Sequence, residues 1–481
     1  MNKIKAKIKN NIPAFIITIV AVLGRIIAFI LATPVIYQHD VKAASGHFDY
    51  AMYIFNNWQL ADNNYYEFAQ PPINAGLQAI LMKFISLFKD YGDDYMALYA
   101  NCKILSLIYS LITLYLFYKI IKEFDLPKNL FNIFYGIMAL YPGLFVMTTQ
   151  YSNDMLSYVF FYLSLYLCIR WAKKPKFSTI IFLALSIGLG MLTKISVGLI
   201  AFIVGPMMLA VLIHSIIMSG QQKSLAKKEV LNIKNKLGKE SSNNVKPFII
   251  VLQIVVFLII VTPIGLSYSI RNYLMFGQGF GEISDVVKGT VFDMTLRSYS
   301  DTERYWTFAF SKLYDGKYDI FHDWTEYNIW VDLVKTSAFD EFQFREYPVY
   351  PALVVVWLYN IIFYFTTFIA MIYNIVTLIM AAVKKEIKNF AKNMLNLRLL
   401  SIMLYVLAIV SFLAFNLKYP YSCNSNYRYI AYILFALVGS LIVLLNDAEK
   451  IKNSTNTLLD KLFDDDNELP KNKKKVSTKK E

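Results

Sequence analysis

The chain has 481 residues, of which 57% are hydrophobic and 16% aromatic, and this composition is too apolar for a soluble globular protein of this size. Its formal net charge of +14 could suggest a nucleic-acid partner, but the distribution of the lysines argues against one. Most lysines and arginines fall in segments that follow every second apolar run, as they do in the cytoplasmic loops of membrane proteins: 1–11, 119–129, 170–177, 218–246, 383–398 and 447–481.

The apolar runs predict an all-α polytopic membrane protein with about ten transmembrane helices and cytoplasmic termini, since one spanning helix needs about 20 apolar residues. The run 178–217 is too long for one helix, and we place a break near Thr193-Lys194-Ile195-Ser196. The first run lacks a small-residue cleavage site after it, which indicates a retained anchor and not a signal peptide. In chain order we expect spans at 12–33, 100–121, 130–148, 155–172, two within 178–217, 247–267, 351–382, 397–416 and 428–446.

These spans make one membrane domain, 1–446, with outer loops at 38–99 and 273–350. A charged cytoplasmic tail follows at 447–481. Because the tail is poor in apolar residues, we expect it to be disordered or to lie on the membrane surface.

The first outer loop contains apolar segments that are too short to span a bilayer. Segment 73–88 predicts an interfacial helix on the outer leaflet, with the Lys83 side chain snorkelling toward the headgroups. Segment 47–58 is a second candidate for such a helix.

Ionisable residues at the edges of apolar spans are costly, so they usually have a partner or a function. Carboxylates and cations at one membrane face suit a reaction in which an acid removes a proton while cations hold a leaving phosphate. Arg25 differs because it lies in the middle of the first span, where a structural pair or snorkelling explains it. The predicted topology brings these residues to one face: Asp40, His47, Asp49, Asp154, Lys194, Arg271 and Arg428.

Each of these residues also has a simpler structural explanation, and it is their joint location at one face that favours a functional site. The alternatives are Asp40 capping a helix that starts near Val41, Asn153-Asp154 capping the next span, a structural His47, Lys194 and Arg428 as interfacial anchors, and Pro71-Pro72 as a rigid start to a helix.

Short stretches spread over most of the chain carry a resemblance: His39-Asp40-Val41, Gly46-His47-Phe48-Asp49-Tyr50, Tyr66-Glu67-Phe68-Ala69-Gln70-Pro71-Pro72, Asn153-Asp154-Met155-Leu156-Ser157, Gly188-Leu189-Gly190-Met191-Leu192-Thr193-Lys194, Arg271-Asn272-Tyr273 and Asn426-Tyr427-Arg428-Tyr429. Their order and topology resemble the GT-C membrane glycosyltransferases, in particular bacterial relatives of the protein O-mannosyltransferases and aminoarabinose transferases. One departure concerns the first loop, where Val41 follows Asp40 and the family often has a second acid. Asp49 is therefore a rival for the role of base.

The resemblance implies an enzyme that transfers a sugar, with inversion, from a polyprenyl-phosphate donor to a protein or a cell-envelope glycan or lipid on the extracytoplasmic face. Asp40 would then be the general base, and His47 would support the base or contact the sugar. Asp154 would orient the acceptor or hold an optional divalent cation, and the resemblance implies no other cofactor. The implied catalytic candidates are Asp40, Asp49, His47 and Asp154. The implied substrate-binding candidates are Glu67, Gln70, Asn272 and three cations for the lipid phosphate, Lys194, Arg271 and Arg428.

Two other functions remain open at this point. A lipid-linked glycan transporter or flippase would also have many spans and buried charges, but it would be expected to show inverted repeats, and none is evident. A ligase or polymerase of the O-antigen kind would also use a large outer loop and arginines, but it needs no acidic base in the first loop. Substitution of Asp40 would therefore separate this alternative from a glycosyltransferase with a first-loop base.

Overall fold

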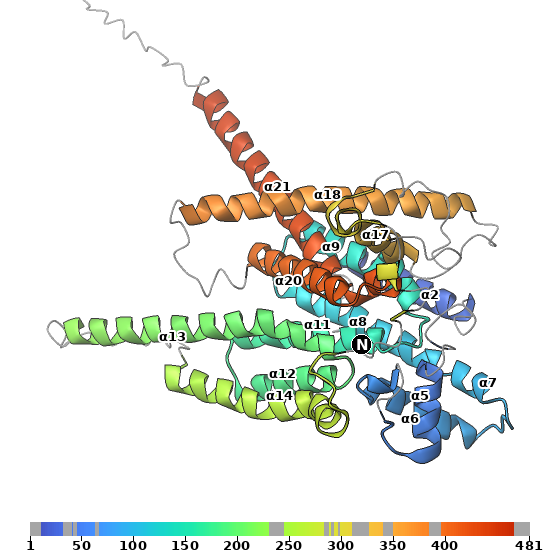
Figure 1. Cartoon of the computed structure of the whole chain (residues 1–481). Helices are drawn as coiled ribbons and strands as arrows, with labels where there is room; N and C mark the ends of the chain where they lie inside the picture. Colours follow the sequence, from blue (N-terminus) through green and yellow to red (C-terminus); the bar gives the residue numbers. More distant parts are fainter. Residues whose placement is uncertain are drawn as a thin grey trace, which may run out of the picture.

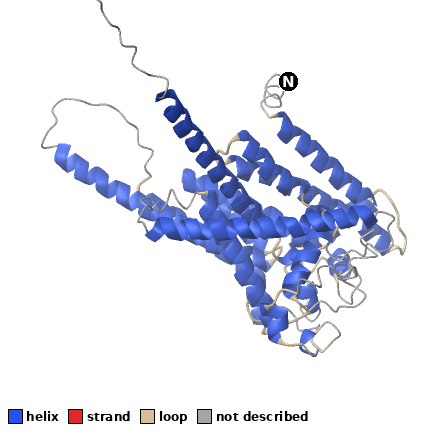
Figure 2. Ribbon diagram, turned by 90° about the horizontal axis from the view of Figure 1, so that it is seen from above, coloured by secondary structure: helices blue, strands red, loops and turns tan. Residues whose placement is uncertain are grey.

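The fold is almost entirely helical, as expected (Figures 1 and 2). In the part of the chain that is described, the regular structure is helical except for one isolated β-bridge between Asp293 and Tyr421. The computed structural model describes residues 11–31, 41, 46–62, 67–229, 245–282, 288–289, 293–296, 299–309, 327–339, 350–383 and 396–465.

The long helices form a bundle, and a smaller group of helices gathers at one end of it (Figure 1). The long helices are α2 (Ile12–Leu31), α8 (Lys103–Lys122), α9 (Lys128–Leu140), α11 (Asp154–Lys173), α12 (Phe177–Met191), α13 (Ala201–Glu229), α14 (Pro247–Phe276), α18 (Tyr350–Val383), α20 (Leu397–Lys418) and α21 (Ile433–Asp465). The shorter elements are α5 (His47–Asn57), η1 (Glu67–Ala69), α6 (Ile73–Ser86), α7 (Tyr95–Ala100), α10 (Pro142–Met147), η2 (Ile195–Ile200), η3 (Met294–Leu296), η4 (Thr302–Trp306), α17 (Ile329–Phe339), η5 (Ser422–Ser425) and η6 (Tyr427–Tyr429).

Every predicted span contains a helix, and the chain is a multi-pass membrane protein. Seven helical segments in the described residues are long and apolar enough to cross a membrane on their own. The other three predicted spans contain α9 with α10, α12 and α21. The first of these is interrupted where Tyr141 is extended ahead of Pro142, because the ring of a proline disfavours helical backbone in the residue before it.

The predicted break within 178–217 is confirmed. α12 ends at Met191, Lys194 has extended backbone with φ −154° and ψ 123°, and η2 begins at Ile195. The loop end of α12 is tied to the first outer loop, because the Ile73 N–H donates to the carbonyl of Leu192 at 3.2 Å. The break therefore places Lys194 beside the start of α6.

The helices of the predicted spans 247–267 and 428–446 extend further than predicted. α14 continues through Arg271 and Asn272 to Phe276 and ends at Gly277, whose φ of +68° is a left-handed conformation that glycine adopts without strain. α21 continues from the apolar run to Asp465, so residues 447–465 are helical and the first of the two expectations for the tail, disorder, is wrong for them. The second expectation, a position on the membrane surface, stays a prediction. Once a packed segment has nucleated a helix, charged residues with good helix propensity can propagate it.

Arg25 has the structural role that its mid-span position suggested. Its side chain is 1% exposed and donates to Ser110 Oγ at 2.8 Å, to the Ala21 carbonyl at 3.0 Å and to the Ala139 carbonyl at 2.9 Å. These bonds tie α2 to α8 and α9, so Arg25 is a satisfied internal cation and not a snorkelling one.

Close packing near Gly143 positions the segment that carries Arg428. A β-carbon on Gly143 of α10 would lie 2.2 Å from the Ser337 carbonyl oxygen of α17 and 3.5 Å from the Tyr427 ring. Because the closest atom belongs to backbone, Gly143→Ala is expected to lower the free energy of unfolding by about 1–3 kcal/mol. Thermal unfolding of the purified variant checks this, with Gly205→Ala as the control because a β-carbon there meets nothing within 4 Å. Equal melting temperatures for the two variants would contradict the packing argument.

Candidate functional site

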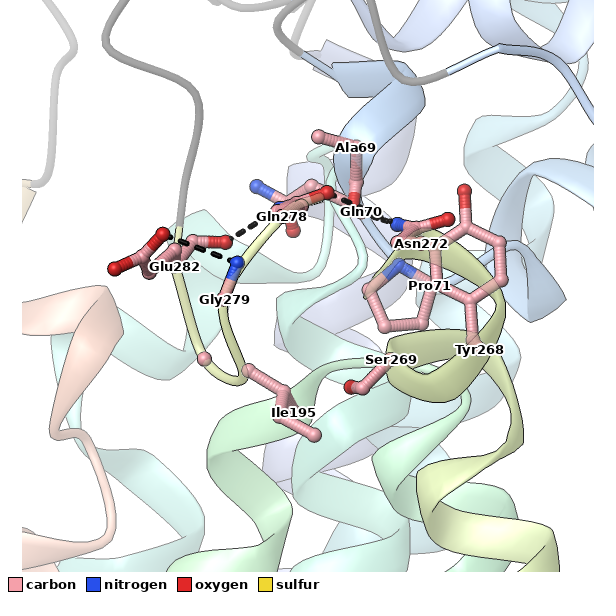
Figure 3. A pocket seen from close by; sticks show the side chains of 11 residues that line it. Ala69, Gln70, Pro71, Ile195, Tyr268, Ser269, Asn272, Gln278, Gly279 and Glu282 are labelled. Carbon is pink, nitrogen blue, oxygen red and sulfur yellow. Dashed lines mark hydrogen bonds between the residues drawn. The ribbon is translucent and has the colours of Figure 1, made fainter. Parts of the chain in front are cut away.

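Two adjacent pockets lie where the predicted loops meet. The cationic pocket is lined by Asp154, Ser157, Tyr158, Phe161, Lys194, Ser196, Val197, Arg428, Tyr429 and Tyr432. The amide pocket, seen in Figure 3, is lined by Ala69, Gln70, Pro71, Ile195, Tyr268, Ser269, Asn272, Gln278, Gly279, Gly281 and Glu282.

An ion pair between Asp154 and Lys194 forms the centre of the cationic pocket. Asp154 is the first residue of α11 and is 2% exposed, whereas Lys194 comes from the break between α12 and η2. Both side chains are largely buried, so Lys194 is not the interfacial anchor of the alternative explanation. The pairing brings together two predicted site residues that lie 40 positions apart.

Arg428 supplies a second cation to the same pocket. It lies in η6 and is 2% exposed, which also argues against an interfacial anchor. Its backbone is fixed on both sides, because its N–H donates to Asn426 Oδ1 at 2.8 Å and its carbonyl accepts the Tyr158 hydroxyl. The guanidinium carbon lies 5.3 Å from the centroid of the Tyr429 ring, and Lys194 Nζ lies 4.6 Å from the same centroid. Tyr429 thus contacts both cations through its ring.

The helix termini add to the positive potential of this pocket. Asp154 opens α11, and Ser196 and Val197 lie in the first turn of η2, which leads into α13. The N-terminus of a long helix carries a partial positive charge and favours a bound anion. Two cations, one carboxylate and a helix N-terminus therefore make the pocket suited to an anion such as a phosphate.

Asn153 connects the first outer loop to the cationic pocket, a link that the sequence did not reveal. Its Nδ2 donates to Gln70 Oε1 at 3.0 Å and to the Thr193 carbonyl at 3.1 Å. Asn153 occupies the N-cap position of α11, but its side chain makes no capping bond. The only sequence signal for this role was the adjacency of Asn153 to Asp154.

The amide pocket is built around the end of α14. Asn272 Nδ2 donates to the Ala69 carbonyl at 3.4 Å and to Gln278 Oε1 at 3.1 Å. The Tyr268 hydroxyl donates to the Phe68 carbonyl at 2.6 Å and lies 3.3 Å from the Tyr50 hydroxyl. Burial, reinforced by Tyr268, raises the pKa of Tyr50 well above its usual value, so that phenol stays neutral. These contacts hold the Gln70–Pro71 turn against α14.

Arg271 does not join the other two predicted phosphate ligands. Its guanidinium donates to the Ala61 carbonyl at 2.9 Å and to Asn272 Oδ1 at 3.0 Å, and it lies over the rings of Tyr268 and Phe276. It lines neither of the two pockets. The structure therefore places Arg271 as a contact between α14 and the first outer loop.

The acids of the first loop occupy different positions. His47 Nδ1 lies 3.3 Å from Glu67 Oε2, and both side chains are buried. Asp49 is half-buried on α5, and neither of the two pockets is lined by His47, Asp49 or Glu67. Asp40 and His39 lie outside the described residues.

A cluster of three or more His, Cys, Asp and Glu side chains suited to a metal ion is not found among the residues that are described. Asp154 faces two cationic side chains in the cationic pocket. A divalent cation at Asp154 stays a prediction from the resemblance.

The fold and the site define a polytopic helical membrane protein with a buried cationic pocket between its helices. Residues 79–229, from α6 to α13, match the family model of the dolichyl-phosphate-mannose-protein mannosyltransferases. The matched segment contains Asp154 and Lys194, and it confirms the resemblance to the protein mannosyltransferases. No curated protein matches the chain.

Among solved structures, the apo form of the oligosaccharyltransferase of Archaeoglobus fulgidus is similar, with 12% identity and a TM-score of 0.45. The similarity covers 92% of this chain and 52% of that chain, so this chain spans about half the length of the archaeal protein.

Proposed function

We propose that this protein is a membrane glycosyltransferase that takes a sugar from a polyprenyl-phosphate carrier and transfers it, with inversion, to an acceptor hydroxyl on the extracytoplasmic face. The acceptor would be a protein or a cell-envelope glycan or lipid. The observation that carries the proposal is the buried cationic pocket, in which Lys194 and Arg428 lie around the Asp154 carboxylate. The family match over residues 79–229, which include Asp154 and Lys194, supports it.

In the proposed reaction the acceptor oxygen attacks the anomeric carbon while the bond from that carbon to the phosphate oxygen breaks. The phosphate stays on the lipid and gains negative charge as it leaves. Lys194 and Arg428 would stabilise this charge, and fixed cations in a water-poor pocket do so without the cost of reorienting solvent. Lys194 would share its ammonium protons between Asp154 and the phosphate. Arg271 would hold the first outer loop against α14.

The acceptor proton would pass to a carboxylate of the first outer loop, with Asp40 as the proposed base and Asp49 as its rival. Asp40→Asn is expected to lower transfer from radiolabelled undecaprenyl-phosphate sugars by about 10²–10⁴-fold in membranes with matched expression, the usual contribution of a general base. Asp49→Asn is measured beside it, and Asp93→Asn, an exposed acid of the same loop, is the matched control.

The outcomes of this comparison separate the assignments. Transfer retained in Asp40→Asn and lost in Asp49→Asn would move the base to Asp49. Absence of transfer from every lipid-linked sugar in the wild type would contradict the proposed glycosyltransferase activity and would favour a transporter or a ligase. A loss in Asp93→Asn equal to that in Asp40→Asn would show that the loop responds to charge alone.

A further inference from the structure

We infer that the amide pocket is a binding site for an uncharged sugar ring, carried either by the lipid donor or by a glycan acceptor. This inference rests on the proposed function, and it assigns a ligand to a pocket distinct from the cationic one. Its polar lining is supplied by amides, a hydroxyl and one carboxylate: Gln70, Asn272, Gln278, Ser269 and Glu282 (Figure 3).

The backbone between the two pockets explains why they are separate. Lys194 and Ser196 line the cationic pocket, whereas Ile195 between them lines the amide pocket. Lys194 is the extended residue that precedes η2, and Ile195 is the first residue of η2. A ligand in the amide pocket therefore lies across this one segment from the Asp154–Lys194 pair.

The charge of the lining excludes a second phosphate. Among the described residues that line the amide pocket, none is a lysine or an arginine, and Glu282 contributes a carboxylate. That carboxylate is half-exposed, lies 3.7 Å from Lys418 Nζ and accepts the Gly279 N–H at 3.1 Å. A pocket without a cation favours a neutral ligand, whereas the neighbouring pocket favours an anion.

Two hydrogen-bonding groups of the amide pocket have no partner among the described residues. The Gln70 side chain accepts from Asn153 through Oε1, which leaves its Nε2 donor available. The Ser269 hydroxyl makes no hydrogen bond to these residues. By contrast, the hydroxyl of Ser267, two residues earlier in α14, donates to the Ile264 carbonyl at 2.9 Å. Asn272 and Gln278, by contrast, bond to each other. An available donor and an available hydroxyl suit the hydroxyl groups of a sugar.

The apolar part of the lining suits the same ligand. Pro71 and Ile195 contribute aliphatic surface, and Tyr268 contributes ring carbon, next to the amides. A sugar ring presents hydroxyl groups at its rim and C–H groups on its faces, so a lining that mixes amides with aliphatic surface complements it. An anionic group would find no cation in this lining, and the Glu282 carboxylate is already paired with Lys418. A lipid chain would leave the amides without hydrogen bonds to it.

The test measures binding to the full-length protein in lipid nanodiscs. The probes are undecaprenyl phosphate, undecaprenyl phosphate that carries mannose or glucose, and the soluble methyl mannoside and methyl glucoside. The variants are Ser269→Ala, Ser269→Phe and Gln70→Glu, the last of which keeps the oxygen that accepts from Asn153 and removes the donor. Ser267→Ala is the matched control, and the melting temperature of each variant checks its folding.

If the ligand is the donor sugar, the wild type binds a sugar-bearing lipid more tightly than the bare lipid. Ser269→Ala and Gln70→Glu would each reduce this advantage about five-fold, the effect of one hydrogen bond. The advantage is the ratio of the affinities for the sugar-bearing and the bare lipid in the same variant, so a change in phosphate binding that is common to both lipids cancels. If the ligand is an acceptor glycan, the variants keep the tighter binding of the sugar-bearing lipid. They instead lose binding of the methyl mannoside or the methyl glucoside. Either result supports the inference.

Ser269→Phe would fill the pocket, and this variant gives the result that can overturn the inference. If a folded Ser269→Phe variant changes neither the sugar advantage nor hexoside binding, or if the wild type shows neither, the inference is overturned. Failure of every lipid to bind the wild type would contradict the proposed function instead, and the hexoside measurements would still test the pocket.

Discussion

Replacement of Lys194 by glutamine is expected to lower the rate of sugar transfer by about two to three orders of magnitude, the usual loss when a fixed group that stabilises transition-state charge is removed. Lys194 is the cation closest to Asp154 in the cationic pocket, and it lies at a break between two helices that the packing holds in place. Glutamine keeps hydrogen-bonding capacity but supplies no charge to the leaving phosphate. Transfer from a lipid-linked sugar in membranes with matched expression measures the effect.

The same substitution is expected to destabilise the protein, which calls for a second variant. It leaves Asp154 buried with its closest cation removed, and loss of one partner of a buried pair costs about 3–5 kcal/mol. The double variant Asp154→Asn with Lys194→Gln removes both charges and is expected to recover most of the melting temperature without recovering transfer. Recovery of transfer in the double variant would contradict a phosphate contact and would make Lys194 a structural partner of Asp154.

Replacement of Arg428 by glutamine is expected to lower transfer by about 100-fold or more, with a smaller effect on folding. The bonds that fix this residue to Asn426 and Tyr158 use its backbone, so they survive a change of side chain. The lost group is the guanidinium over Tyr429 in the cationic pocket. Arg170→Gln is the control, because Arg170 is an exposed cation at the opposite end of α11. Transfer by Arg428→Gln within two-fold of that control would contradict a role in holding phosphate.

Much of the helical architecture could be predicted from the sequence because membrane spans are set by apolar length and loop charge. The break before Ile195 was predictable for the same reason, since the apolar run 178–217 is too long for a single crossing of a bilayer. The proximity of Asp154 and Lys194 then followed from topology, because both residues lie at the same end of neighbouring spans.

The remaining contacts depend on side-chain packing that no periodicity encodes. Arg271 lies at the predicted end of the bundle, yet its guanidinium contacts Ala61 and Asn272 and not the pocket of Lys194 and Arg428. Asn153 has the sequence of a helix cap but bonds across to Gln70. Short polar side chains at helix ends can serve either their own backbone or a neighbouring segment, and the choice is made by the tertiary structure.

The uninterrupted course of α21 determines where a soluble protein fused after Asp465 would be held. At 1.5 Å per residue, the helical segment from Asp447 to Asp465 spans about 28 Å. Figure 1 shows this segment pointing away from the other helices. A rigid partner joined in helical register at Asp465 would therefore stand clear of the lipid and detergent belt, and would give electron-microscopy images of this small membrane protein an asymmetric feature for alignment.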